Sequence, residues 1–177
     1  LVPQQAAQLC ETSEALALLA KFDAVLIGGQ AIPADLIEHL KQHSVTTVLS
    51  YGSTETCGGC VYDGAPLDGT AIRIADGRVV VAGPVVMRGY RTGSEGLNDD
   101  GSFTMPDCGE LIDGKLRILG RDDDIVIVKG VNVSPSHIES QLANLGVRAV
   151  VVIDATSESL VAVVELGDDR DAGTEAV

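Results

Sequence analysis

Ala24-Val25-Leu26-Ile27-Gly28-Gly29 is the stretch that decides the fold expected from this sequence. A short apolar run closed by two glycines indicates a buried strand that ends in a tight turn. Pro33 then opens an amphipathic helix, and residues 45–49 form a second apolar run. Strand, helix and strand in this order make a βαβ unit, which implies a parallel sheet.

The residues before this unit predict a further helix. Ser13 is expected to be its N-cap, and Leu16, Leu19 and Ala20 follow at the spacing of one helix face. Residues 1–60 are therefore expected to form an α/β region.

The pattern changes between residues 61 and 120. Short apolar runs, predicted as strands, cover residues 71–74, 78–82 and 115–119. Asp-Gly pairs separate the runs and stand at residues 63–64, 76–77, 100–101 and 113–114. Asp-Gly between apolar runs is typical of two-residue hairpin turns, so we expect an antiparallel, barrel-like β subdomain here.

Residues 121–177 return to a mixed pattern. Ser134-Pro135 is a good N-cap and first-turn pair for a helix. Strands are predicted at residues 125–128, 147–153 and 160–165. The acidic run 122–124 predicts a linker between two cores, and a merely solubilising acidic turn is the alternative. We therefore expect a mixed α/β protein with a larger domain of residues 1–120 and a smaller one of residues 121–177.

The charge and composition of the chain exclude several classes of function. The sequence has 26 acidic and 12 basic residues, a formal net charge of −14, which opposes binding to nucleic acid because phosphate backbones need a basic face. No apolar stretch approaches the roughly 18 residues that a membrane span needs, so we expect no such span. The 4 cysteines are too few for a disulfide framework in a chain of 177 residues, which favours a reduced, cytoplasmic protein.

The residues from Tyr51 to Glu55 follow the second apolar run and combine the groups that an ATP site needs. The Tyr51 ring can stack on a purine, and the backbone at Gly52 can approach a ligand closely. The Thr54 hydroxyl can donate to a phosphate, and the Glu55 carboxylate can hold Mg²⁺, which prefers oxygen ligands. The alternative is an ordinary strand-to-loop turn with a capping threonine.

A Cys-x-x-Cys pair, Cys57 and Cys60, follows directly. One such pair supplies only two of the four ligands of a structural zinc site, and the three histidines of the chain are not at paired spacing. A redox function is another alternative, because such a pair can open a helix beside a βαβ unit. We expect two small packing residues beside a binding loop.

Several segments together resemble the adenylate-forming superfamily, which includes acyl-CoA synthetases, nonribosomal adenylation domains and luciferases. Tyr51-Gly52-Ser53-Thr54-Glu55 matches its Tyr-Gly-x-Thr-Glu motif, and Gly28-Gly29-Gln30 is similar to its Gly-Gly-Ala/Ser turn beside the acyl and adenine pocket. Residues 120–123 resemble its Gly-Arg-x-Asp/Lys hinge, and the similarity continues through residues 129–135. Several ordered motifs carry more weight than any one of them alone.

The resemblance implies roles for individual residues. Thr54 and Glu55 would be catalytic, and Glu55 would hold the magnesium ion. Asp107 would accept hydrogen bonds from both ribose hydroxyls of ATP or AMP, with Arg121 as the second ribose contact. Pro106 replaces the glycine of the family's Thr-Gly-Asp motif, and a turn aspartate that bonds its own backbone is the alternative for Asp107.

Three further residues would act when the thioester forms. Asp123 would be the hinge about which the small domain rotates. Lys129 and Gly130 would border the pantetheine route of coenzyme A, where a glycine lets a thin chain pass close to the backbone.

The resemblance implies an ATP-dependent acid–thiol ligase. A carboxylic acid would attack the α-phosphate of ATP, giving acyl-AMP and pyrophosphate, and CoA would then displace AMP. Residues 54–67 look most like o-succinylbenzoate–CoA ligases of menaquinone biosynthesis. The alternatives are another acyl- or aryl-CoA ligase, a carrier-protein adenylation domain, and a non-catalytic nucleotide-binding module.

Two features of the superfamily do not occur in the sequence: its phosphate loop ending in lysine, and its lysine near the extreme C-terminus. The first residues also have neither a starting Met nor the basic segment of a signal peptide. We therefore expect a C-terminal fragment that is inactive by itself and can self-associate through exposed apolar surface or an open strand edge.

Overall fold

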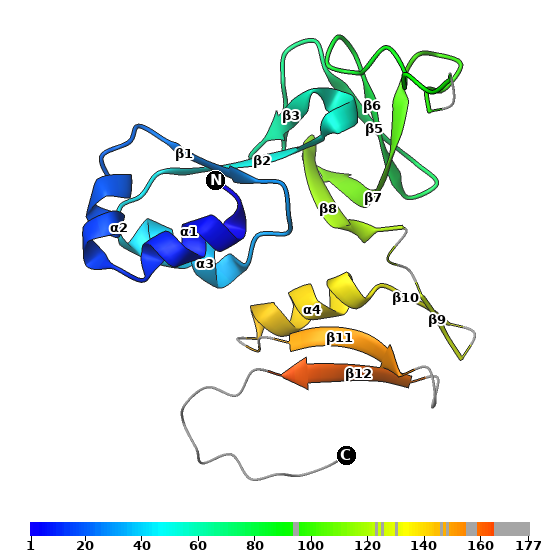
Figure 1. Ribbon diagram of the computed structural model, residues 1–177. Helices are drawn as coiled ribbons and strands as arrows, with labels where there is room; N and C mark the ends of the chain where they lie inside the picture. The colour runs from blue at the N-terminus through cyan, green and yellow to red at the C-terminus, as the bar shows by residue number, and fades with distance from the viewer. Residues whose placement is uncertain are drawn as a thin grey trace. The chain divides into compact units, whose positions relative to one another are not determined.

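The computed structural model describes residues 1–93, 96–122, 124, 126–129, 131–145, 147, 149–154 and 159–164. The chain divides into two compact units, Leu1–Asp124 and Ile125–Val177 (Figure 1). The first unit contains an α/β region and an antiparallel β region. The predicted mixed α/β class is confirmed.

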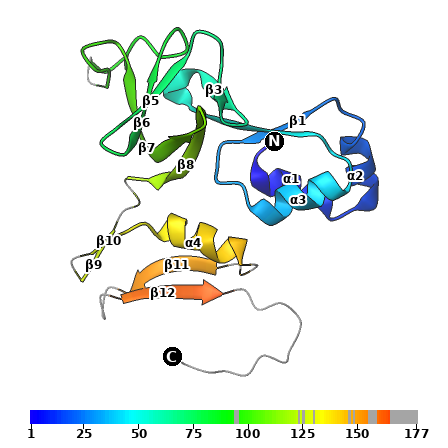
Figure 2. The same ribbon diagram turned by 180° about the vertical axis from the view of Figure 1, so that it is seen from behind.

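The α/β region is a parallel pair of strands with helices on one side. Its elements are α1 (Pro3–Cys10), α2 (Ser13–Leu19), β1 (Val25–Gly28), α3 (Ala34–Gln42) and β2 (Thr47–Ser53). In the parallel pair, Val25 lies opposite Thr47 and Gly28 lies opposite Ser50. Figures 1 and 2 show the three helices on the same side of β1 and β2. The predicted βαβ unit is therefore present, with α3 as its helix.

Helices and strands of this region share one aliphatic core. Its buried residues are Ala6, Leu16, Leu19, Val25, Ile27, Leu36, Leu40 and Val45. Alternate residues of β1 face the core, because successive side chains of a strand point to opposite faces. Leu26, on the other face, is exposed.

Three details of the helices differ from the prediction. α1 was not expected, because it buries only Pro3 and Ala6 and so carries a weak apolar pattern. The N-cap of α2 is Thr12 and not Ser13, since the Thr12 backbone is extended and its Oγ1 accepts a hydrogen bond from the Ala15 N–H at 3.3 Å. Ala20 is exposed and ends the helix.

Strand β2 belongs to both regions of the first unit. It pairs with β1 on one side and antiparallel with β3 (Gly58–Tyr62) on the other, and β3 continues to β4 (Ala65–Pro66). The β2–β3 ladder is irregular between Tyr51 and Gly52. The segment predicted to bind ATP therefore lies where the parallel sheet becomes antiparallel.

The antiparallel region contains a second sheet in the order β5-β6-β7-β8. These strands are β5 (Ala71–Ala75), β6 (Arg78–Ala82), β7 (Phe103–Ile112) and β8 (Lys115–Arg121). Residues of β3, β6, β7 and β8 bury one shared core: Cys60, Val61, Val79, Val81, Phe103, Met105 and Leu116. The Leu116 N–H donates to the Gly64 carbonyl at 2.8 Å, which links the two sheets. Two sheets around one core give the barrel-like arrangement that the sequence predicted.

Three of the four Asp-Gly pairs form the expected hairpin turns. In each of them both residues have positive φ, close to +50° for aspartate and +80° for glycine; they are Asp63-Gly64, Asp76-Gly77 and Asp113-Gly114. Two consecutive positive φ values define the type I′ turn, which matches the twist of the flanking strands. The fourth pair, residues 100–101, has a positive φ only at Gly101 and lies in the turn before β7.

The second unit contains two antiparallel strand pairs and one helix among its described residues. These elements are β9 (Val126–Val128), β10 (Val131–Val133), α4 (Pro135–Asn144), β11 (Ala149–Asp154) and β12 (Ser159–Val164). The helix packs on β11, and Glu139 Oε1 accepts a hydrogen bond from the Val151 N–H at 2.8 Å. Helix α4 begins at Pro135, the predicted first helical residue.

The boundary between the units lies after Asp124, whereas the sequence placed it after residue 120. Arg121 still pairs with Asp107 in the β7–β8 ladder, and the Asp122 N–H donates to the Pro106 carbonyl at 2.7 Å. Among the described residues, no helix is long and apolar enough to cross a membrane.

Candidate functional site

The segment predicted to bind ATP ends strand β2 and forms a short 3₁₀ helix, η1 (Thr54–Thr56). Ser53 Oγ accepts from the Glu55 N–H at 3.2 Å, and Thr56 Oγ1 accepts from the Ser53 N–H at 2.8 Å. Thr56 is buried and also donates to the Gly58 carbonyl at 2.8 Å. The turn is thus fixed by Ser53 and Thr56, which leaves Thr54 exposed and Glu55 half-buried.

The glycines of the site are required by the fold itself. A Cβ at Gly52 would overlap the Gly58 carbonyl oxygen of β3, and a Cβ at Gly28 would overlap the Ser50 carbonyl of β2. Gly29 has a φ of +86°, which side chains rarely adopt, and Gln30 is exposed. Gly28 ends β1 opposite Ser50, so the Gly28-Gly29-Gln30 turn lies beside the strand that carries Tyr51.

Tyr51, Asp107 and Arg121 come together from three strands. The Tyr51 hydroxyl donates to Asp107 Oδ2 at 2.7 Å, and Arg121 Nη1 lies 4.0 Å from Asp107 Oδ1. Asp107 lies within β7, directly opposite Arg121 of β8, so the alternative of a turn aspartate is wrong. Burial, and then the hydrogen bond to Asp107, raise the pKa of Tyr51 well above its ordinary value, which keeps this phenol neutral.

Glu55 is contacted from the connection between β6 and β7. The Tyr90 hydroxyl donates to Glu55 Oε1 at 2.8 Å, and the Met87 N–H donates to the Glu55 carbonyl at 2.7 Å. The Tyr90 phenol, and after it the Ser53 hydroxyl, lower the pKa of Glu55. The sequence analysis did not predict a role for Tyr90. It could have been noticed because it is one of only 3 tyrosines and stands among glycines.

The chemistry of Glu55 fits a magnesium ion bound together with a substrate. Among the described residues no group of three or more His, Cys, Asp or Glu side chains could hold a metal ion. Mg²⁺ does not need such a group, because proteins often bind it through one or two carboxylates plus substrate phosphates. An ionised, accessible carboxylate next to the exposed Thr54 hydroxyl meets that requirement.

The remaining predicted residues belong to the region after β8. Lys129 is an exposed residue with a φ of +49° in the turn between β9 and β10 of the second unit. Asp123 and Gly130 lie outside the described residues. The geometry described above therefore concerns the first-unit part of the predicted site.

The Cys-x-x-Cys pair does not form a helix start. Cys57 is exposed, with a left-handed φ of +57°, and Cys60 is fully buried in strand β3. Burial raises the pKa of the Cys60 thiol, which makes it a poor nucleophile. All four cysteines are free thiols.

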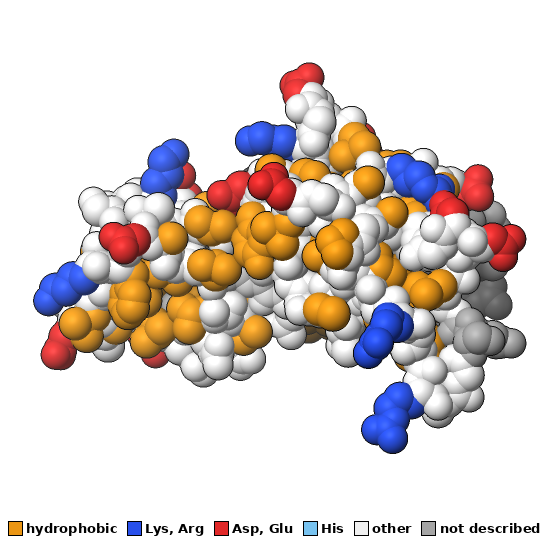
Figure 3. Space-filling model, turned by 90° about the horizontal axis from the view of Figure 1, so that it is seen from above, with side chains coloured by type: hydrophobic (Ala, Val, Ile, Leu, Met, Phe, Trp, Pro, Cys, Tyr) orange, Lys and Arg blue, Asp and Glu red, His pale blue; other side chains and the backbone are white. Residues whose placement is uncertain are grey.

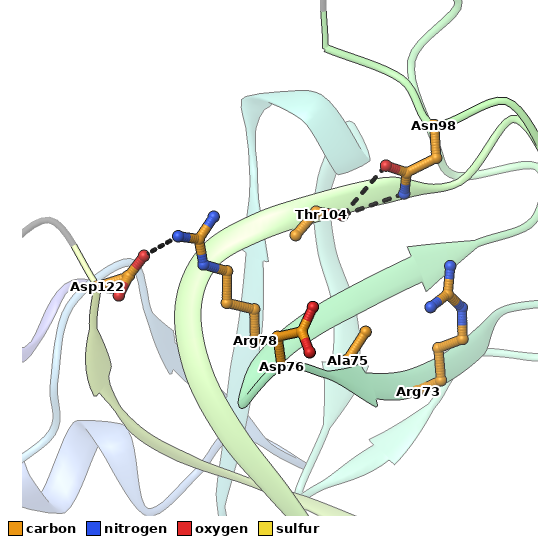
Figure 4. A pocket seen from close by; sticks show the side chains of 7 residues that line it. All are labelled: Arg73, Ala75, Asp76, Arg78, Asn98, Thr104 and Asp122. Atoms are coloured by element: carbon orange, nitrogen blue, oxygen red, sulfur yellow. Dashed lines mark hydrogen bonds and ion pairs between the residues drawn. The ribbon is translucent and has the colours of Figure 1, made fainter.

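A polar pocket of about 480 Å³ lies on the antiparallel sheet, and none of the residues predicted to bind nucleotide lines it. It is lined by Arg73, Ala75, Asp76, Arg78, Asn98, Thr104 and Asp122 (Figure 4). Arg78 pairs with Asp122, and Arg73 Nη2 lies 3.4 Å from Asp100 Oδ2. Because carboxylates neutralise both arginines, the pocket does not offer a ready site for an anion.

The fold and the site together are those of an adenylate-forming domain. A parallel strand pair continues into an antiparallel barrel-like region, and the junction gathers Tyr51, Asp107 and Arg121. No protein-family model matches the sequence. A probable 2-succinylbenzoate–CoA ligase of Mycobacterium tuberculosis is 36% identical over 95% of this chain and 47% of its own length. The chain is thus similar to the 2-succinylbenzoate–CoA ligases of the adenylate-forming superfamily.

Solved structures agree with the sequence comparison. E. coli MenE with a bound phenylether-linked analogue of OSB-AMS superposes with a TM-score of 0.78 and 29% identity, over 98% of this chain and 42% of that one. The o-succinylbenzoate coenzyme A synthetase (MenE) of Bacillus subtilis, in complex with ATP and magnesium ion, superposes with a TM-score of 0.67 and 26% identity, over 88% of this chain and 38% of that one. The chain thus spans about half the length of these relatives, or less.

Proposed function

We propose that this chain supplies the nucleotide-binding and hinge region of an ATP-dependent acid–thiol ligase that acts on 2-succinylbenzoate. The carboxylate attacks the α-phosphate of ATP and releases pyrophosphate, and the CoA thiol then displaces AMP from the acyl-adenylate. The names of the relatives support this substrate. Because the chain spans about half their length, we assign the activity to a polypeptide of the relatives' full length.

The observation that carries this proposal is the convergence of Tyr51, Asp107 and Arg121. The Tyr51 ring offers a face for the purine, and the Asp107 carboxylate can accept hydrogen bonds from ribose hydroxyls. In the structure that carboxylate accepts from Tyr51 Oη at 2.7 Å. A ribose hydroxyl would therefore meet an oriented acceptor, with the Arg121 guanidinium nearby as a second contact.

We assign the phosphate end of the site to Thr54 and Glu55. The exposed Thr54 hydroxyl would donate to a phosphate oxygen, and the Glu55 carboxylate would hold Mg²⁺. Magnesium supplies charge neutralisation at the phosphate oxygens when bound. The contribution of the protein is to position these groups and to place donors where negative charge develops.

We assign the acyl border to Gly28-Gly29-Gln30 and the hinge to Asp123. Asp122, the residue before the proposed hinge, is held in the first unit twice, through its side chain to Arg78 and through its N–H to Pro106. Lys129 and Gly130 would border the pantetheine of CoA. The free thiols of the chain are in keeping with a reducing, cytoplasmic compartment.

Self-association of the 177-residue polypeptide is a separate proposal. Leu18, Phe22 and Leu26 are exposed in the α/β region. Figure 3 shows hydrophobic side chains gathered on the face of that region seen from above. Contiguous apolar surface promotes association, which sedimentation of the polypeptide over a range of concentrations would measure.

The function is tested by assaying a protein of the relatives' full length for pyrophosphate exchange that depends on added acid. Exchange with 2-succinylbenzoate, followed by AMP release on addition of CoA, is expected. Exchange with other aryl or alkyl acids but not with 2-succinylbenzoate would show that the proposed substrate is wrong. Transfer of the acyl group to a carrier protein and not to CoA would show an adenylation domain. Nucleotide binding without any exchange would show a non-catalytic nucleotide-binding module.

A further inference from the structure

The connection between β6 and β7 contacts Glu55 at two points. The backbone N–H of Met87 donates to the Glu55 carbonyl at 2.7 Å, and the Tyr90 hydroxyl donates to Glu55 Oε1 at 2.8 Å. One bond fixes the main chain of the glutamate and the other fixes its carboxylate. This segment therefore contacts both the backbone and the carboxylate of Glu55, which is half-buried at a turn.

The Tyr90 ring packs against Gly96 and Met87 although 45% of the residue is exposed. A Cβ added at Gly96 would lie 2.7 Å from Tyr90 Cε2 and 3.3 Å from Met87 Cε, so the ring and the methionine lie directly over the bare Cα of this glycine. Tyr90 and Gly93 also form an antiparallel bridge. These contacts restrict the rotation of the side chain that places the hydroxyl on Glu55.

We infer that Tyr90 is a positioning residue for Glu55, held in place by Gly96 and anchored through Met87. This inference rests on the proposed function, in which Glu55 binds Mg²⁺ with a nucleotide. A glutamate has three rotatable bonds, and a hydrogen bond to one carboxylate oxygen restricts them. Groups that orient a metal ligand in this way commonly change metal affinity 10- to 100-fold when they are removed, as a rough guide.

Tyr90→Phe tests this role, because it deletes the hydroxyl and keeps the ring over Gly96. In a protein of the relatives' full length, we expect the Mg²⁺ concentration for half-maximal pyrophosphate exchange to rise about tenfold. The rate at saturating Mg²⁺ should change much less, because the ligand itself remains. Binding of Mn²⁺ in the presence of ATP, followed by the electron paramagnetic resonance of the unbound ion, should weaken by a similar factor.

Tyr62→Phe is the matched control. It also removes one phenol hydroxyl, which donates to the Gly59 carbonyl at 3.3 Å and does not touch Glu55. Its Mg²⁺ dependence and Mn²⁺ affinity should equal those of the unsubstituted protein. Equal effects of the two substitutions would overturn the inference, and so would an unchanged Mg²⁺ dependence in Tyr90→Phe.

Alanine substitutions at two glycines test whether the packing of the Tyr90 ring matters. Gly96 and Gly93 have similar φ values, +143° and +149°, so alanine strains the backbone alike at both positions. Only the Cβ at position 96 meets the Tyr90 ring, since that at position 93 has open space. Gly96→Ala should weaken Mn²⁺ binding and Gly93→Ala should not; equal weakening would show that strain, and not the ring, is responsible.

The two proposals fail separately. Absence of acid-dependent pyrophosphate exchange in the unsubstituted protein would overturn the ligase, whereas the Mn²⁺ measurement with ATP still reports the role of Tyr90. Normal exchange together with unaltered Mn²⁺ binding in Tyr90→Phe would overturn the role of Tyr90 and keep the ligase.

Discussion

The two ends of the candidate site are built in different ways. At the proposed nucleoside end, Tyr51, Asp107 and Arg121 lie on β2, β7 and β8, whose ladders fix their backbones. At the proposed phosphate end, Thr54 and Glu55 lie on a three-residue 3₁₀ helix, and Glu55 accepts hydrogen bonds from Met87 and Tyr90 of the β6–β7 connection. Changes at the first end should therefore affect ligand affinity and stability together, and changes at the second should affect rate with the fold intact.

Glu55→Gln should give the largest effect and act at the phosphate end alone. A neutral amide is a poor ligand for Mg²⁺, so the adenylation step should lose about 2–4 kcal/mol of transition-state stabilisation. The thermal midpoint should change little, because the capping bonds of η1 come from Ser53 and Thr56. Pyrophosphate exchange in the full-length protein and a thermal melt provide the two measurements, and near-normal exchange would remove Glu55 from the metal site.

Gly52→Ala should act on the fold, although it lies only three residues before Glu55. The added methyl would overlap the Gly58 carbonyl oxygen, a backbone atom that moves only if β3 moves. Overpacking of this kind costs about 1–3 kcal/mol. Denaturant unfolding of the 177-residue polypeptide measures it. A loss of stability well below about 1 kcal/mol would contradict the packing argument.

Asp107→Asn should weaken AMP binding, whereas a change at the phosphate end should not. The amide keeps an acceptor for Tyr51 but loses the charge that strengthens hydrogen bonds from ribose, so AMP binding should weaken by about 1.5 kcal/mol, roughly tenfold. Glu55→Gln should leave AMP binding unchanged, because no metal is needed to bind the nucleoside. Calorimetric titration of AMP into both variants tests this, and equal weakening would mean that the ends are not separable.

The parts of the fold that the sequence predicts well are those set by local chemistry. Asp63-Gly64, Asp76-Gly77 and Asp113-Gly114 form their turns because each pair needs only its own positive φ values. The βαβ unit was predictable because apolar runs and one amphipathic helix alternate over a short span. The mixed α/β class followed from these two patterns.

Strand β7 was not predicted, because Pro106, Asp107 and Gly109 interrupt its apolar alternation. The β6–β7 ladder is irregular between Arg78 and Val80, opposite this stretch, and proline is tolerated in a sheet at such irregular positions. Missing β7 also left Asp107 as a turn residue in one interpretation.

Contacts distant in sequence explain what remained unseen in the site. Tyr90 meets Glu55 across 35 positions, and Tyr51 meets Asp107 across 56. No local pattern encodes such pairs. The resemblance to a family suggested Tyr51 and Asp107 as neighbours of one ligand, whereas Tyr90 lies outside the segments that carried the resemblance and was not predicted.

The smallest expected effect is a loss of stability at alkaline pH, which compares the tyrosine of each end, Tyr51 and Tyr90. The pKa of Tyr51 is raised from 10.0, chiefly by burial, so the folded state keeps this phenol neutral while the unfolded chain ionises it. The unfolded state then binds fewer protons, and the stability should fall by about 1 kcal/mol per pH unit above pH 10. Below pH 10 the contribution is fully present. Tyr51→Phe should flatten this decline in urea unfolding curves. Tyr90→Phe should flatten it far less, because Tyr90 is exposed and its pKa is raised first by the hydrogen bond to Glu55, with burial and the Glu55 charge as the smaller causes. Equal flattening by the two substitutions would mean that the strands bury the nucleoside end no better than the loop buries the phosphate end.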